Sequence, residues 1–255
     1  METPILILSL SFYFIAAVLC FFKKSSEKIF LSVMAVAIVL HLIAMIIRSV
    51  AVLHPPFTNL YETFLLLSFL LALRLVFWKR QFPKNLRWLI LAIIYLFLLT
   101  ALVMPTSYKM PKPLMPALNS AWMYIHVPSY FFGYMALILG FIYAATLLVH
   151  RWKNPERDDL SLVNRMDTEI KIAFLFLNIG LVTGGIWAYR SWGNYWAWDP
   201  KETWALINIF IMAFYFHLDK PTVTRKAVLV ILVLLSVIFT YLGVTFIFSG
   251  LHSYA

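Results

Sequence analysis

Long apolar stretches, separated by short polar segments, follow one another along the whole chain. They lie near residues 4–22, 29–52, 59–78, 87–104, 127–149, 170–189, 203–218 and 227–248. A helix needs about 20 apolar residues to cross the hydrocarbon core of a bilayer, and these stretches reach or approach that length. The seventh is short. The pattern predicts an all-α integral membrane protein with about eight transmembrane helices.

The composition agrees with lipid as the main solvent. Of the 255 residues, 63% are hydrophobic and only 13% are charged, whereas a soluble domain needs far more polar surface. The first stretch has no basic start and no small-residue cleavage site, so we expect a membrane helix and not a cleaved signal peptide. The single cysteine, Cys20, lies in that stretch, and there is no CxxC pair. We therefore expect no thiol chemistry from this chain.

The basic residues predict the orientation. The net charge is +10, and most of the Lys and Arg residues fall in alternate loops, near 23–28, 79–87, 151–171 and 220–226. Loops rich in Lys and Arg stay in the cytoplasm, which predicts that both termini are external. The same rule explains the positive charge, so we expect no nucleic acid partner.

The connections suggest one membrane domain over residues 1–255. Residues 105–122 carry four prolines and are predicted to form an extended external loop. Residues 151–169 are predicted to be a polar cytoplasmic loop with a short surface helix. Residues 190–203 are predicted to be an external, tryptophan-rich loop.

Residues 192–204, WGNYWAWDPKETW, contain four tryptophans and a helix-start signal. Asp199 is placed to cap the next helix, with Pro200 at its first position and Glu202 in a capping box. A direct functional role for Asp199 and Glu202 stays open beside this structural one. Tryptophans gather at membrane interfaces as anchors, but four in one loop also form a surface suited to a broad, flat, apolar ligand.

Two of the six histidines lie beside that loop in the predicted topology. His126 precedes the fifth apolar stretch, and His252 follows the eighth. Each one alone is typical of a polar anchor at the interface. Together with the aromatic loop they match the requirements of bis-histidine haem ligation, namely two axial nitrogens and apolar or aromatic faces for the porphyrin.

Other polar residues within the apolar stretches have two interpretations each. His41 lies in mid-membrane, where an ionisable group is a functional candidate, or it is a neutral imidazole bonded to a neighbouring helix. His217 is a candidate for a second haem site, or it reaches toward water at a helix end. Arg48 is placed to pair with a propionate or to reach the interface. The glycines at 180, 184 and 185 favour close helix packing or the approach of a flat macrocycle.

The run WGNYWAWDPKETWAL resembles the WWD signature of haem-handling membrane proteins. It is most similar to the CcsA (ResC) branch of cytochrome c biogenesis System II, because the DPKETWAL continuation is typical of that branch. The segments HPPFTNLYETF at 54–64 and MYIHVPSYFFGYMAL at 123–137, and the terminal SGLHSYA, agree with this family in order and spacing. No Walker, GxSxG, HExxH or Rossmann pattern is present.

The resemblance implies a function. Such proteins carry haem b to an external site and attach it to the CxxCH motif of apocytochrome c, as part of a holocytochrome c synthase with a CcsB (ResB)-type partner. No CcsB-like region is visible in this sequence, so we expect half of a synthase. The implied location is the bacterial cytoplasmic (inner) membrane, with the WWD loop on the periplasmic side. Thiol-reducing proteins would keep the apocytochrome cysteines reduced.

The resemblance also implies a set of site residues. His126 and His252 correspond to the external axial ligands of the haem iron. The haem-binding loop corresponds to Trp192, Trp196, Trp198 and Asp199. His217 matches an intramembrane histidine linked to a second haem, and His41 is a further candidate for haem binding. No residue is assigned a catalytic role.

Three other functions are compatible with the residues. A haem exporter or chaperone would hand haem on without attaching it. A small-molecule transporter would bind a different flat substrate on the aromatic loop, although the paired broken helices typical of many transporters are not visible. A quinol-linked electron carrier would use haem for redox chemistry only.

Overall fold

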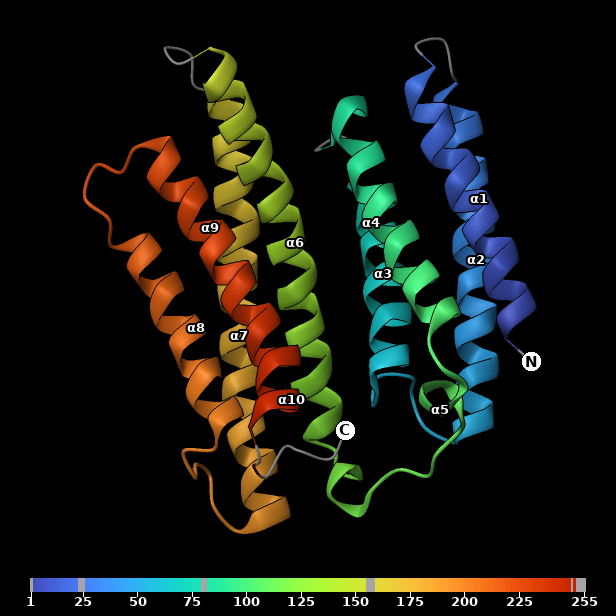
Figure 1. The fold of residues 1–255 in the computed structure, drawn as a ribbon, viewed down its shortest axis with the longest axis vertical. Coiled ribbons are helices and arrows are strands. Elements are labelled where there is room, and N and C mark those ends of the chain that lie inside the picture. Colours follow the sequence, from blue (N-terminus) through green and yellow to red (C-terminus); the bar gives the residue numbers. More distant parts are fainter. Residues whose placement is uncertain (1, 23–25, 79–81, 155–158, 249, 251–255) are drawn as a thin grey trace. The chain divides into compact units, whose positions relative to one another are not determined.

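The computed structural model describes residues 2–22, 26–78, 82–154, 159–248 and 250, which form helices with no strand among them (Figure 1). Seven helices are long and apolar enough to cross a membrane. With α9 and its continuation counted as one, they are α1 (Thr3–Phe21), α2 (Glu27–Val52), α3 (Leu60–Phe77), α4 (Lys84–Val103), α6 (Met123–Lys153), α7 (Leu160–Trp192) and α9 (Val223–Ile238). The prediction of an all-α, multi-pass membrane protein is confirmed.

The eighth predicted crossing, at 203–218, corresponds to α8 (Pro200–Phe216). Its 17 residues extend about 25 Å at 1.5 Å per residue, slightly less than the hydrocarbon core of a bilayer. Many large apolar side chains on these helices are exposed, among them Val50, Phe210 and Phe246. Such side chains are unfavourable in water but compatible with lipid.

The polar segment between α6 and α7 is more helical than predicted. Helix α6 continues through Lys153 and α7 starts at Leu160, so both ends of the expected 151–169 loop are helical. Residues 160–169 contain no proline or glycine to interrupt a helix. A polar helix makes its backbone hydrogen bonds internally, so it can continue outside the bilayer. Asp159 caps α7 by accepting hydrogen bonds from the backbone N–H groups of Ser161 and Leu162. The Ser161 hydroxyl also donates to this carboxylate and, with the two N–H groups, holds the pKa of Asp159 below its usual value.

The chain divides into two compact units, residues 1–115 and 116–255, and the single membrane domain over 1–255 stays a prediction. In the first unit α1 packs against α2 and α4, and α3 packs against α2 and α4. The proline-rich 105–122 segment is split between the units. It holds a short helix, α5 (Thr106–Lys109), in the first and a 3₁₀ turn, η2 (Pro116–Leu118), in the second.

A buried ion pair lies in the first unit. Arg48, only 1% exposed, donates from Nε to Glu62 Oε1 at 3.0 Å and also donates to the carbonyl of Lys109. Glu62 accepts two more hydrogen bonds, from the backbone N–H and the hydroxyl of Thr58, each at 2.9 Å. Arg48 is buried and does not reach the interface, whereas its pairing with a propionate stays a prediction. It holds α3 and the end of α5 to α2.

In the second unit α6 packs along α7 and α9, and α8 packs against α9. Helix α9 continues through a wider π-helical turn, η3 (Phe239–Gly243), into the short α10 (Val244–Ile247). The start of α6, the end of α7, the start of α8 and α10 gather at one end of this unit (Figure 1). That end carries most of the predicted site.

Candidate functional site

The tryptophan loop joins α7 to α8. Gly193 ends α7 with a left-handed backbone (φ 82°), a conformation that glycine adopts without a steric penalty. Trp196 and Trp198 then meet edge to face, with ring centroids 5.7 Å apart. Trp198 is 68% exposed. The loop therefore displays an aromatic face outside the helix bundle.

The start of α8 has the predicted capping box. A side-chain oxygen of Asp199 accepts a hydrogen bond from the backbone N–H of Lys201 at 3.0 Å. Glu202 Oε2 accepts from the backbone N–H groups of Asp199 and Ala197, at 3.2 and 2.9 Å. Asp199 is only 7% exposed. The structural role of both carboxylates is confirmed, and a direct role of Asp199 toward a ligand stays a prediction.

His126 lies in the first turn of α6, because that helix starts at Met123 and not at 127 as expected. Its Nδ1 lies 2.7 Å from the carbonyl oxygen of Gly180 on α7. A carbonyl oxygen only accepts, so Nδ1 carries the proton and the lone pair of the neutral ring is on Nε2. Histidines that bind metals through one nitrogen commonly donate from the other in this way.

The helix glycines make room for side chains of α6. A Cβ atom added to Gly184 would lie 2.5 Å from Cε1 and Nδ1 of His126. One added to Gly180 would lie 2.7 Å from the ring of Tyr130, which itself meets the His126 ring at 5.0 Å. These contacts show close helix packing, and the approach of a flat macrocycle stays a prediction. Their small size lets the imidazole lie against the α7 backbone.

Trp187 connects His126 to the tryptophan loop. The His126 ring stacks on Trp187 with centroids 5.6 Å apart and an interplanar angle of 20°. Trp187 also meets Trp192 edge to face at 4.8 Å. It is 3% exposed, and its Nε1 donates to the carbonyl of Ala117 at 2.7 Å. His126 and Trp192 are thus brought together through a residue that the sequence analysis did not select.

A signal for Trp187 was present in the sequence. Gly180, Gly184, Trp187 and Ser191 follow one another at helical spacing and therefore share one face of α7. Ser191 lies on the same face and donates to the same carbonyl of Ala117, at 3.2 Å. Extending the glycine face by one turn toward the loop would have identified Trp187.

Of the other predicted site residues in the second unit, His217 does not join this cluster. His217 is the C-cap of α8, is exposed, and donates from Nδ1 to the carbonyl of Ala213 at 2.7 Å. It lies at the opposite end of α8 from Asp199, about 25 Å along the helix. His41 is buried in the first unit, with Nδ1 3.4 Å from the Tyr13 hydroxyl of α1 and its ring against Phe69 of α3.

His252 lies outside the described residues. Gly250, two positions earlier, is described and lies directly against the carboxylate of Asp199. His54, to which no role was assigned, is buried in the first unit with its Nδ1 2.9 Å from the carbonyl of Pro55.

Comparison with known proteins gives the family. Residues 57–252 match the family model described as "Cytochrome C assembly protein". A "Cytochrome c biogenesis protein CcsA" of Prochlorococcus marinus is 31% identical, over 91% of this chain and 85% of that protein. The CcsA proteins of Chlamydomonas reinhardtii and Guillardia theta are each 34% identical, over 79% and 78% of this chain. The chain belongs to the CcsA family.

This member of the CcsA family spans 61% of the Chlamydomonas protein and 76% of the Guillardia protein. A solved structure titled "Cytochrome c Heme Lyase CcmF" resembles it with a TM-score of 0.70. The likeness covers 98% of this chain but 47% of that one, at 20% sequence identity. At that identity the likeness is one of fold. The family match includes the tryptophan loop, His126 and His252.

Proposed function

We propose that this CcsA-family chain, acting in cytochrome c biogenesis, presents haem b at an external site for covalent attachment to apocytochrome c. The observation that carries the proposal is the setting of His126. Its Nδ1 donates to the Gly180 carbonyl, its ring is stacked on Trp187, and Trp187 touches Trp192 of the tryptophan loop. An imidazole fixed in this way is oriented before any ligand arrives.

The residues present fit haem. With Nδ1 donating to the Gly180 carbonyl, the lone pair of the neutral His126 ring is on Nε2, the kind of nitrogen that haem proteins use as an axial ligand. Trp192, Trp196 and Trp198 supply aromatic surface for the porphyrin. His252 is proposed as the second axial ligand, which is supported by the position of Gly250 against Asp199. Asp199 would then border the site as well as cap α8.

Attachment needs placement more than acid–base chemistry. Each cysteine S–H of the CxxCH motif adds across one haem vinyl group, forming one C–S and one C–H bond with no atom lost. Holding the two reactants together raises their effective concentration greatly. The axial histidines would hold the haem with its vinyl edge accessible and tune the redox potential of its iron. The histidine of CxxCH would then replace one of them, which provides a release step.

The remaining expectations concern location and partners. The chain is a multi-pass membrane protein, and we propose the bacterial cytoplasmic membrane with the tryptophan loop on the periplasmic side. A CcsB (ResB)-type membrane protein is the proposed partner, with apocytochrome c as substrate and thiol-reducing proteins keeping its cysteines reduced. His217 would serve a second haem site, at the cytoplasmic end of α8. His41 stays a candidate for haem binding in the first unit.

Absorption spectroscopy of the purified full chain tests the proposal. The wild type should carry haem with a Soret band, six-coordinate when reduced. His126→Gly and His252→Gly should each lose haem or become five-coordinate, and added imidazole should restore the sixth ligand. His150→Gly is a matched control, because His150 is an exposed histidine at the other end of α6. Unchanged six-coordinate spectra and normal cytochrome c maturation in both site variants would contradict the proposal.

The second candidate is a haem exporter or chaperone that does not attach haem. The exposed Trp198 supports this function as well as the first, since an open aromatic face would present haem both to a protein that attaches it and to one that only receives it. An in vitro ligation assay separates the two. Reduced haem-loaded protein, with its partner, is mixed with a CxxCH peptide, and thioether formation is measured by mass spectrometry. Transfer of haem without a thioether would identify the chaperone.

A further inference from the structure

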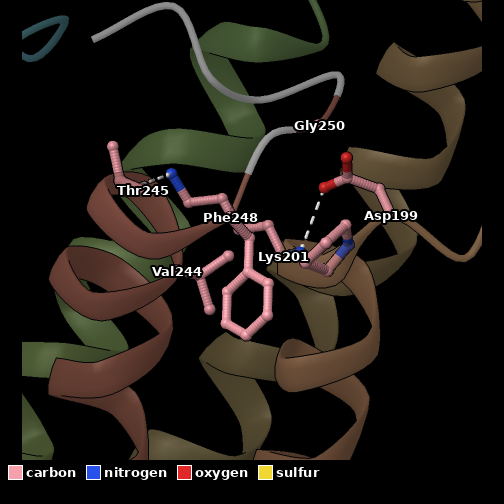
Figure 2. Close-up of a pocket in the computed structure, with 7 residues that line it drawn as sticks. Asp199, Lys201, Val244, Thr245, Phe248 and Gly250 are labelled. Carbon is pink, nitrogen blue, oxygen red and sulfur yellow. Dashed lines mark hydrogen bonds between the residues drawn. The ribbon is translucent and has the colours of Figure 1, made fainter.

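Lys201 is a cation at the edge of the tryptophan loop. It lies in the first turn of α8, and its ammonium donates to Thr245 Oγ1 of α10 at 3.2 Å. The same ammonium lies 5.7 Å from the ring centroid of Tyr241. Figure 2 shows the side chain crossing from α8 to Thr245, away from the Asp199 carboxylate. The side chain is therefore fixed in position and is not free in solvent.

A small pocket surrounds Lys201. It is lined by Asp199, Pro200, Lys201, Val244, Thr245, Phe248 and Gly250 (Figure 2). Most of these contribute apolar surface or backbone. Asp199 is the acidic residue among them, and its carboxylate is used by the backbone N–H of Lys201 and lies against Gly250. The pocket thus combines an apolar wall with one ammonium group.

Lys201 differs from three other buried or partly buried cations of the chain. Arg48, Arg87 and Lys226 each have a carboxylate oxygen within 3.0 Å, supplied by Glu62, Glu27 and Asp167. Within the part of the chain that the structure describes, no carboxylate oxygen lies within 4.0 Å of the Lys201 ammonium. A hydroxyl and an aromatic face solvate it only in part. The Asp199 carboxylate lines the same pocket but makes no ion pair with this ammonium within 4.0 Å, so an acidic ligand in direct contact with it would be stabilised there.

We propose that Lys201 binds a carboxylate of the ligand held on the tryptophan loop, which for haem is a propionate. The inference rests on the proposed function. Lys201 follows Trp198 by three residues and shares the pocket with Gly250, so the ammonium borders the same loop that would hold the porphyrin. The hydrogen bond to Thr245 would remain when the carboxylate binds, because an ammonium has three donors and the Thr245 hydroxyl uses only one.

Tyr241 ties this ammonium to the helix that carries His126. The Tyr241 ring meets Tyr134 of α6 at 6.0 Å, and Tyr134 lies two helical turns beyond His126 on α6. Tyr130, one turn beyond His126, meets both His126 and Tyr134. The metal ligand and the ammonium are therefore joined by one continuous row of aromatic rings.

Titration of the purified full chain with haem b and with haem dimethyl ester tests this inference, because the ester keeps iron and porphyrin but has no carboxylates. The wild type should bind haem b about tenfold more tightly than the ester, as one charge-assisted hydrogen bond provides. Lys201→Gln should weaken haem b binding about tenfold and leave ester binding unchanged. Lys201→Arg should restore most of the affinity. Lys112→Gln removes an exposed lysine of the 105–122 segment and should change nothing.

The outcomes separate the two proposals. Equal wild-type affinity for haem b and for the ester would overturn the role of Lys201 and leave haem presentation standing. The same holds if Lys201→Gln weakens both ligands equally, since the residue would then act through the structure of the loop. A wild type that binds neither ligand would overturn both proposals. Because the wild-type comparison needs no variant, a misfolded Lys201→Gln protein does not prevent a decision.

Discussion

At the scale of single residues, the absence of a side chain at Gly184 determines where the His126 ring lies. The imidazole occupies the space that a Cβ atom would take, and only there does Nδ1 reach the carbonyl of Gly180. The hydrogen-bond partner of this ring is thus a backbone group, whose position depends on how closely α6 approaches α7. The size of a residue on α7 therefore controls the orientation of a ring on α6.

Gly184→Ala should weaken haem binding about tenfold while the protein still folds. The added methyl group would lie 2.5 Å from two ring atoms, and relief of such overpacking costs about 1–3 kcal/mol. The measurement is a haem titration followed at the Soret band, with the reduced spectrum reporting coordination. Gly140→Ala is the control on the same helix pair, because its Cβ would lie 3.2 Å from the flexible end of Ile170. An equal loss of haem affinity in both variants would mean that the loss comes from general helix packing and not from displacement of the His126 ring.

The Arg48–Glu62 pair is a second residue-scale feature with a measurable consequence. Arg48→Met should destabilise the protein by about 3–5 kcal/mol, because it leaves the fully buried Glu62 carboxylate without its cation. The double variant Arg48→Met with Glu62→Leu should recover most of that loss. Thermal unfolding in detergent, compared across the two single variants and the double variant, measures the coupling. A double variant as unstable as Arg48→Met would show that the unpaired Glu62 carboxylate is not the cause of the lost stability.

At the scale of elements, the start of α8 combines two requirements in a few residues. Asp199 and Glu202 satisfy backbone donors at the helix end, and the residues around them form the loop that is proposed to hold haem. Capping and ligand binding predict different responses to the same substitutions. The two roles of Asp199 are therefore separable by the choice of replacement.

Asp199→Asn and Asp199→Ala should differ if capping is the only role of this residue. Asparagine caps helices about as well as aspartate, whereas alanine costs about 1 kcal/mol. We expect Asp199→Asn to keep the stability of the wild type and Asp199→Ala to lose about that amount, measured by unfolding of the ligand-free protein. If the charge also acts on the ligand, Asp199→Asn should lower haem affinity without lowering stability. Loss of stability in the asparagine variant would argue against the cap as described.

The elements themselves were largely predictable, and their boundaries were not. Apolar runs identify a helix within lipid because lipid requires every backbone group to be satisfied internally. Helical segments outside the bilayer need not be apolar, so apolar runs do not mark them. The extensions of α6 to Lys153 and of α7 back to Leu160 were therefore missed. The capping box was found because its signal is local, with Asp199, Pro200 and Glu202 at fixed spacing. Trp187 was missed because its partners, His126 and Ala117, are distant in sequence.

At the scale of the whole molecule, the predicted orientation depends on charge alone. Lys and Arg are concentrated in alternate loops, and this distribution predicts that residues 193–199 face outward and residue 154 faces the cytoplasm. The division into two compact units was not foreseeable, because apolar helices look alike whichever neighbour they pack against. The sites proposed on the second unit would all depend on this orientation.

Cysteine labelling in intact cells tests the orientation. In a Cys20→Ser background, Asn194→Cys should react with a membrane-impermeant maleimide from outside. Asn154→Cys should react only after the membrane is permeabilised. Both asparagines are exposed, so accessibility within the fold does not distinguish them. The reverse labelling pattern would invert the topology and place the tryptophan loop in the cytoplasm.

The π-helical turn at Phe239–Gly243 has a consequence for how this helix can change in length. Such a turn accommodates one extra residue within an α-helix, so the helix after it keeps the angular phase that it would have without that residue. Thr245 and Phe248 come directly after it and line the Lys201 pocket. Deleting a single residue at this turn would leave a regular α-helix with Thr245 on the same face, whereas a deletion elsewhere in α9 would rotate Thr245 by about 100° away from the ammonium. Among homologous chains, gain or loss of one residue in this helix should therefore be concentrated at this turn.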